Sequence, residues 1–129
     1  MDHQKVFSTH IFVKDNYLAP QRLPAMQEEI KNLYKNTTNF QTGPNLDQTE
    51  PFKWFANDIG KTAFDIIDKL NYDVEQIEIT GMWGNILQPG ETHPPHTHSN
   101  NFLSGVFYLE SDAETGIIFS DPRPAADVL

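Results

Sequence analysis

Apolar residues in the first half of the chain recur at the three- and four-residue spacing of an α-helix in two places. From Arg22 to about Lys35 they are Leu23, Met26, Ile30, Leu33 and Tyr34. From Pro51 to Leu70 they are Phe52, Phe55, Ile59, Ala63, Ile66, Ile67 and Leu70. Polar residues separate them, and Pro51 suits a first turn, so the pattern predicts two amphipathic helices. The Asn-, Gly- and Pro-containing residues 36–51 between them are expected to form a loop.

Elsewhere the patterns are typical of strands: apolar and polar residues alternate over 74–88, and residues 102–109 form an apolar, β-branched and aromatic run with one Ser-Gly step. Strands are predicted over residues 6–7 and 11–13, 74–88, 102–109 and 116–120, with turns at Asp15-Asn16, at Pro89-Gly90 and over 110–116. Two helices followed by antiparallel strands, with no βαβ alternation, predict an α+β but mainly β fold. We expect a partial double-stranded β-helix, of the jelly-roll or cupin-like kind, with two N-terminal covering helices.

The 129 residues, 38% of them hydrophobic, are expected to form a single domain. Its parts would be an N-terminal strand and helices over 1–73, a partial jelly-roll core over 74–121 and a tail over 122–129. Nine Lys and Arg against 18 Asp and Glu give a net charge of −9, which disfavours nucleic acid as a partner. The sequence shows no membrane-spanning stretch and no signal peptide, so a cytoplasmic protein is expected.

The candidate chemistry lies in the segment His93-Pro-Pro-His96-Thr-His98. His96 and His98 are two residues apart, so on an extended backbone both imidazoles leave the same side and can bind one metal ion. Pro94 and Pro95 stiffen the approach to His96. The chain has no cysteine, which leaves nitrogen and oxygen ligands. The His-x-His spacing does not choose between zinc and iron, and a solvated histidine-rich turn is the plainer interpretation.

Trp83 and Asn85 share one face of the predicted strand 74–88, which turns at Pro89-Gly90 into the histidine segment. Both side chains are therefore expected to point toward whatever the histidines bind. A buried amide needs a hydrogen-bonding partner. The partner of Asn85 is either a ligand or a neighbouring loop.

Several motifs together resemble a known family. They are Trp83-Gly-Asn85 followed by Pro-Gly, His96-Thr-His98-Ser-Asn, Leu103-Ser-Gly-Val-Phe-Tyr-Leu109, and a final strand that ends in Asp-Pro-Arg123. This combination resembles the 2-oxoglutarate-Fe(II) oxygenases of marine bacteria and cyanophages, and the helical N-terminal part also looks similar. A phage-encoded member would work in the host cytoplasm.

The resemblance implies a double-stranded β-helix that holds Fe(II) through a facial triad, with His96 and His98 matching its first motif. It also implies 2-oxoglutarate as cosubstrate and O₂ as oxidant in the hydroxylation of an unactivated C–H bond. Ser104 and Tyr108 share the parity of the histidines and become candidate contacts of the cosubstrate together with Asn85. Tyr108 is equally well explained as a core aromatic residue. No residue is assigned as a catalytic acid or base.

The sequence departs from the family pattern in one respect. Similar proteins carry a later metal-binding histidine and a basic residue that pairs with the far carboxylate of 2-oxoglutarate. Here no histidine follows His98, and Arg123 is the only later basic residue. Three explanations stay open: a shortened protein with little activity, completion by a second chain or a symmetric copy, or a replacement third ligand among His93, Asp112 and Asp121.

Two other functions are compatible with the sequence. One is a non-catalytic jelly-roll module that binds a metal or another ligand and acts through assembly. The other is a zinc- or manganese-dependent cupin-like protein with no cosubstrate. The substrate cannot be named from the residues, because target-binding loops vary within a fold.

Overall fold

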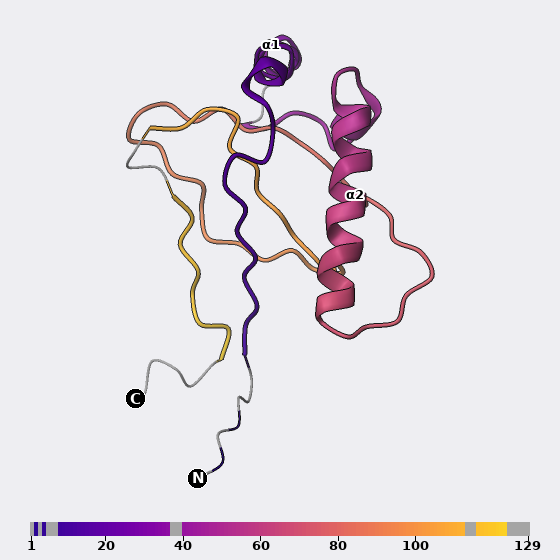
Figure 1. Ribbon diagram of the computed structural model, residues 1–129. Helices are drawn as coiled ribbons and strands as arrows, with labels where there is room; N and C mark the ends of the chain where they lie inside the picture. Colours follow the sequence, from indigo (N-terminus) through magenta and orange to yellow (C-terminus); the bar gives the residue numbers. More distant parts are fainter. Residues whose placement is uncertain (1, 3, 5–7, 37–39, 113–115, 124–129) are drawn as a thin grey trace.

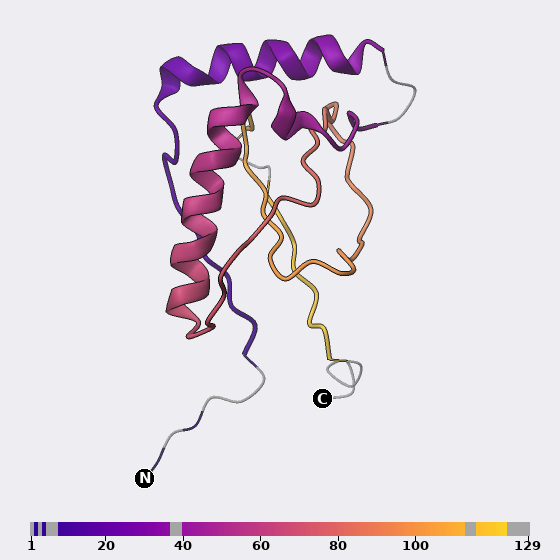
Figure 2. The same ribbon diagram turned by 90° about the vertical axis from the view of Figure 1, so that its right-hand side faces the viewer.

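The computed structural model describes residues 2, 4, 8–36, 40–112 and 116–123. Its regular elements are a short 3-10 helix η1 (Pro20–Arg22), helix α1 (Leu23–Tyr34), a second 3-10 helix η2 (Leu46–Gln48) and helix α2 (Phe52–Lys69). Figures 1 and 2 show α1 lying across the N-terminal end of α2, with the two helix axes steeply crossed. The remaining described chain runs as irregular segments beside this pair. No helix within the described ranges is both long enough and apolar enough to cross a membrane.

Both predicted helices are confirmed to within one or two residues at each end. Their buried residues fall on the predicted apolar stripes, with Met26 and Ile30 on α1 and Phe52, Phe55 and Ile67 on α2. Asn71, directly after α2, has a φ of 59°. This left-handed conformation ends the helix, and asparagine tolerates it better than most residues.

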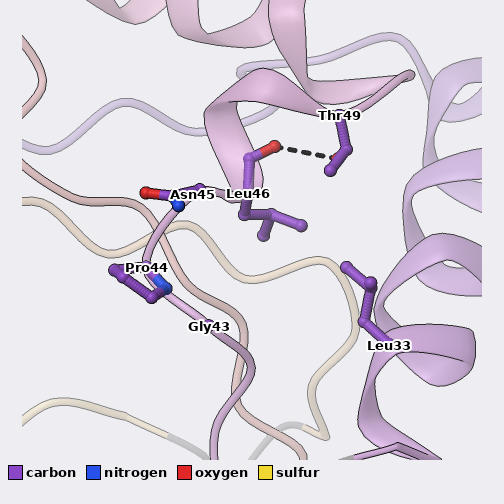
Figure 3. A pocket seen from close by; sticks show the side chains of 6 residues that line it. All are labelled: Leu33, Gly43, Pro44, Asn45, Leu46 and Thr49. Carbon is purple, nitrogen blue, oxygen red and sulfur yellow. Dashed lines mark hydrogen bonds between the residues drawn. The ribbon is translucent and has the colours of Figure 1, made fainter.

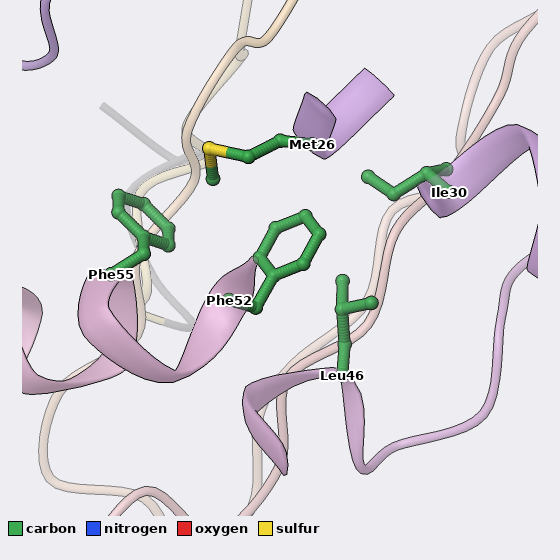
Figure 4. Packing of buried hydrophobic residues seen from close by; sticks show 5 residues of the cluster. All are labelled: Met26, Ile30, Leu46, Phe52 and Phe55. Atoms are coloured by element: carbon green, nitrogen blue, oxygen red, sulfur yellow. The ribbon is translucent and has the colours of Figure 1, made fainter. Parts of the chain in front are cut away.

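The core lies where α1 crosses the start of α2. Its buried side chains are Met26, Ile30, Leu46, Phe52 and Phe55, which point toward one another in Figure 4. Leu46 comes from the interhelical loop and is 3% exposed, because η2 packs against α2. Phe107 and Leu109 pack on the same cluster from the C-terminal half of the chain. Burial of these apolar side chains therefore joins the two helices, the interhelical loop and the C-terminal half of the chain.

The predicted jelly roll is wrong for the part of the chain that the structure describes. Residues 11–13, 74–88, 102–109 and 116–120 form no strand, and the only β-type pairings among the described residues are two isolated bridges. One is antiparallel between Gln41 and Asn85, and the other is parallel between Asn45 and Met82. The predicted strand residues Val6 and Phe7 lie outside the described residues, as do residues 113–115 of the predicted turn and residues 124–129 of the tail.

The absence of a sheet has a physical reason. Alternating polarity specifies which face a segment buries, but a strand also needs a neighbour that exchanges backbone hydrogen bonds with it. Outside the helices, none of the backbone–backbone hydrogen bonds between described residues involves a residue after Glu91. Apolar side chains that a second layer would cover stay open to solvent, including Val106 at 64% and Ile118 at 93% exposure.

The predicted alternation survives only in part of the segment 74–88. Ile77 and Ile79 are half-buried while Glu78 and Thr80 are exposed, but from Gly84 onward the sense is reversed, because Gly84 is buried whereas Asn85 and Leu87 are exposed. The segment 102–109, predicted to be a buried strand, keeps only Phe107 and Leu109 half-buried, and its other residues are exposed. The sequence pattern therefore identified the inward side only at the start of the segment 74–88. It did not identify a hydrogen-bonding partner.

Residues 82–86 find their partner in the loop between the helices. Thr42 donates its backbone N–H to the carbonyl of Gly84 at 3.0 Å, and the Gly84 N–H returns a 3.0 Å hydrogen bond to the Thr42 hydroxyl. Met82 donates to the Pro44 carbonyl at 2.8 Å and accepts from Leu46 at 3.0 Å. These four hydrogen bonds, called here the loop clamp, hold the segment that carries Trp83 and Asn85 against the helical core.

Candidate metal centre

The approach to the histidines begins at the turn predicted at Pro89-Gly90. Gly90 has a φ of 85°, a conformation that L side chains rarely adopt, which explains glycine at this position. Glu91 closes the turn twice: its backbone N–H donates to the Gln88 carbonyl at 2.9 Å, and its carboxylate accepts the Gln88 N–H at 2.8 Å. The turn sends the chain back past residues 80–85.

Pro94 orients two of the three imidazoles. Its carbonyl oxygen lies 2.9 Å from Nδ1 of His96 and 3.1 Å from Nδ1 of His93. A carbonyl only accepts hydrogen bonds, so each of these Nδ1 atoms carries the proton in the bonded form. The Nε2 atom of a neutral His96 ring then has a free lone pair. Such a backbone hydrogen bond at Nδ1 is a common way to fix the tautomer of a metal-binding histidine.

His96 and His98 bring their Nε2 atoms to within 3.1 Å of each other, and both side chains are exposed. Two nitrogens bound to one metal ion at about 2.1 Å, on neighbouring coordination positions, would be separated by about 3.0 Å. The observed separation therefore fits two ligands of one ion. Without a metal, the same geometry is a hydrogen bond in which one ring donates to the other.

Five rings from three segments form a continuous row around this pair. The neighbouring centroids are 5.1 Å apart between Phe40 and His93, 4.4 Å between His93 and His96, 4.8 Å between His96 and His98, and 5.7 Å between His98 and Trp83. The expected direction of Trp83, toward the histidines, is confirmed. Phe40 was not anticipated from the sequence, because its contact with His93 joins residues that are 53 positions apart.

A third protein ligand is not found among the described residues, where no group of three or more His, Asp or Glu side chains could hold a metal ion. His93 packs its ring against His96. Asp121 is held by Arg123, whose Nε lies 2.9 Å from Oδ1. These hydrogen bonds from the Arg123 side chain and backbone lower the pKa of Asp121 to about 2. Asp112 does not complete a donor group either.

The three candidate cosubstrate contacts are exposed, and the structure does not join them to the histidines. Asn85 pairs its backbone with Gln41. Ser104 lies in the segment between the histidines and Phe107, and Tyr108 keeps 45% of its side chain exposed. Within the described part of the chain, no hydrogen bond or ring contact links Asn85, Ser104 or Tyr108 to His96 or His98.

A shallow pocket lies beside the loop clamp and not at the histidines. It is lined by Leu33, Gly43, Pro44, Asn45, Leu46 and Thr49, and Figure 3 shows the 2.9 Å hydrogen bond from the Thr49 hydroxyl to the Leu46 carbonyl at its rim. Its volume of about 180 Å³ is below the range typical of small-molecule sites. The pocket contributes no charged group.

Comparison with known proteins gives a match to a protein family. Residues 81–128 match a family described as putative 2OG-Fe(II) oxygenase. This stretch contains Trp83, Asn85, the three clustered histidines and Arg123. No curated protein and no solved structure matches the chain.

Proposed function

We propose that this protein acts in a 2-oxoglutarate- and Fe(II)-dependent oxidation, in which His96 and His98 supply two ligands of the iron. The observation that carries the proposal is the 3.1 Å separation of their Nε2 atoms. It lies within the stretch 81–128 that matches the 2OG-Fe(II) oxygenase family. Imidazole nitrogen is a suitable ligand for Fe(II).

The donor set fits the ion in part. Two exposed nitrogens converge, and the Pro94 carbonyl leaves the lone pair of His96 Nε2 available. No further His, Asp or Glu of the described residues joins them, so the other coordination positions would be left to the cosubstrate and to further ligands outside the described residues. When bound together with 2-oxoglutarate and O₂, the iron supplies the oxidising power to hydroxylate a C–H bond while 2-oxoglutarate is converted to succinate and CO₂.

The residues of the chain would hold the iron and orient its ligands. Pro94 fixes the ring of His96, and the contact between the His96 and His98 rings limits the rotation of both. Asn85 is our proposed cosubstrate contact. Asn85 lies two positions after Trp83, and His96 lies two positions before His98. Because Trp83 contacts His98 and the two segments run antiparallel, position 85 faces position 96. Ser104 and Tyr108 stay predictions of the same kind, each with an exposed side chain.

Metal binding without oxidation is the second candidate. It is favoured by the described residues themselves, which offer a pair of donors and not a triad. A protein of this kind would bind zinc or manganese and would give no spectroscopic response to 2-oxoglutarate.

The test is an anaerobic titration of the protein with Fe(II), followed by calorimetry. We expect one ion per chain, and loss of binding in both His96→Ala and His98→Ala. His93→Ala is the matched control, because that ring packs against His96 but offers no convergent nitrogen, and its affinity should stay within a few-fold of the wild type. Unchanged binding in His96→Ala would place the metal elsewhere.

A further inference from the structure

Two side-chain contacts join the segment before the turn to the segment after it. Trp83 lies against His98, with ring centroids 5.7 Å apart and planes tilted by 33°. Thr80 donates its hydroxyl to Oδ1 of Asn101 at 2.6 Å. Trp83 lies three positions after Thr80, and Asn101 lies three positions after His98. The two segments are therefore aligned antiparallel in one common register, although no backbone ladder joins them.

Trp83 is the better anchored partner in this alignment. The loop clamp fixes the residues on both sides of it: Met82 donates to the Pro44 carbonyl, and Gly84 exchanges hydrogen bonds with Thr42. The indole lies over Gly81, where a Cβ atom would be only 3.3 Å from Cζ3 of the ring. Trp83 is half-buried, whereas His98 is exposed.

The two histidines are held in different ways. His96 has a hydrogen bond from Nδ1 to the Pro94 carbonyl. Among the described residues, the rings that His98 contacts are His96 and Trp83, and its Nδ1 atom has no hydrogen bond. A metal-binding histidine usually has its other nitrogen fixed by a hydrogen bond. For His98, the flat indole of Trp83 lies against the ring in place of such a hydrogen bond.

We propose that Trp83 is a positioning residue that holds the His98 ring in its metal-binding orientation and transmits the rigidity of the loop clamp to the metal site. The inference rests on the proposed function, because it needs His98 to be a ligand. It adds a role for a side chain that is not itself a proposed metal ligand or cosubstrate contact. It also explains why the segment 80–85 is tied to the helical core at the level of Trp83.

The first experiment measures the affinity of the full chain for Co(II) by calorimetry. Loss of a group that orients a metal ligand typically lowers affinity by about 10- to 100-fold, and we expect a loss in this range for Trp83→Ala. Trp83→Phe keeps an aromatic face and should recover most of the affinity. Phe40→Ala is the matched control, since it removes a ring of the same row that contacts His93 and neither His96 nor His98.

A second measurement uses the two tryptophans of the chain. In Trp54→Phe, the remaining Trp83 lies beside His98, so Co(II) should quench its fluorescence with the midpoint found by calorimetry. In Trp83→Phe, the remaining tryptophan is Trp54 on α2. The Cζ atom of Arg22 lies 4.1 Å from the centroid of the Trp54 ring, and the fluorescence of Trp54 should be quenched far less.

The outcomes separate the two proposals. Lost Co(II) binding in His96→Ala with wild-type affinity in Trp83→Ala would overturn the positioning role and leave the metal site intact. Wild-type affinity in both variants would overturn the metal site itself. Circular dichroism checks folding; if Trp83→Ala is unfolded, Trp83→Leu replaces it, because leucine fills space without an aromatic face. Wild-type affinity in a folded Trp83→Leu would equally overturn the positioning role.

Discussion

Gly84 lies so close to Ile30 that a Cβ atom at position 84 would be 2.7 Å from Cδ1 and 3.0 Å from Cγ1 of the isoleucine. Ile30 is a core residue of α1, and Gly84 follows Trp83 directly. The backbone of Gly84 packs directly on the Ile30 side chain, and this contact places the segment 82–86 against the helical core. Only glycine leaves the necessary space.

Gly84→Ala is therefore expected to destabilise the protein. Forcing an extra methyl group into a packed core typically costs about 1–3 kcal/mol, and we expect a loss in the free energy of unfolding of this size. Urea unfolding monitored by circular dichroism measures it. Gly43→Ala is the control, because a Cβ there would meet no atom within 4 Å and the backbone φ is not positive. Equal stability of the two variants would contradict the close packing of Gly84 on Ile30.

Thr42→Val tests the loop clamp. Thr42 is 4% exposed, and its hydroxyl accepts the Gly84 N–H at 3.0 Å. Valine keeps the shape but leaves that buried N–H without its partner, which costs about 1–3 kcal/mol. Thr97→Val, at an exposed position, should change the free energy of unfolding by no more than about 0.5 kcal/mol. If Thr42→Val is as stable as Thr97→Val, the hydroxyl does not hold the segment.

Asp121 should titrate well below an ordinary aspartate. Hydrogen bonds from the side chain and backbone of Arg123 lower its pKa from 3.8 to about 2. Because the folded-state pKa is the lower one, the contact stabilises the folded chain above about pH 4. That contribution is lost as the pH falls from about 4 to about 2. A carboxyl carbon NMR titration measures the pKa directly, and Arg123→Gln should move it back toward 3.8. A value near 3.8 in the unaltered chain would refute the pairing.

The helices could be predicted from the sequence because their signal is local. The apolar positions at helical spacing, from Met26 and Ile30 to Phe52 and Phe55, are the positions that the core buries. Turn chemistry was equally informative, since Asn71 and Gly90 adopt the positive φ values that such residues tolerate.

The strands could not be predicted in the same way, because pairing depends on distant residues. Alternation correctly placed Ile77 and Ile79 inward, but it placed Gly84 and Ile86 on the wrong side. The hydrogen-bonding partner of 82–84, however, is the loop around Thr42 and Pro44, which has no strand-like pattern. The expected sheet required partners that the described chain does not supply.

At the candidate site, the spacing of His96 and His98 was enough to predict that their rings can meet. It could not predict that Pro94 accepts from two imidazoles or that Phe40 extends the row, because both depend on the path of the backbone. The expected approach of Asn85, Ser104 and Tyr108 to the histidines assumed regular strands. Without those strands, parity along the sequence no longer places side chains side by side.

The central claim, that His96 and His98 hold the iron of a 2-oxoglutarate-dependent oxidation, is tested most directly by anaerobic visible spectroscopy. Addition of 2-oxoglutarate to the Fe(II)-loaded protein should produce a weak charge-transfer band, because the cosubstrate binds the metal through two oxygens. The band should persist in His93→Ala and vanish in His96→Ala. Fe(II) binding without this band would contradict the claim. The claim would also be contradicted if the protein purified with one zinc per chain and gave no band after exchange to Fe(II).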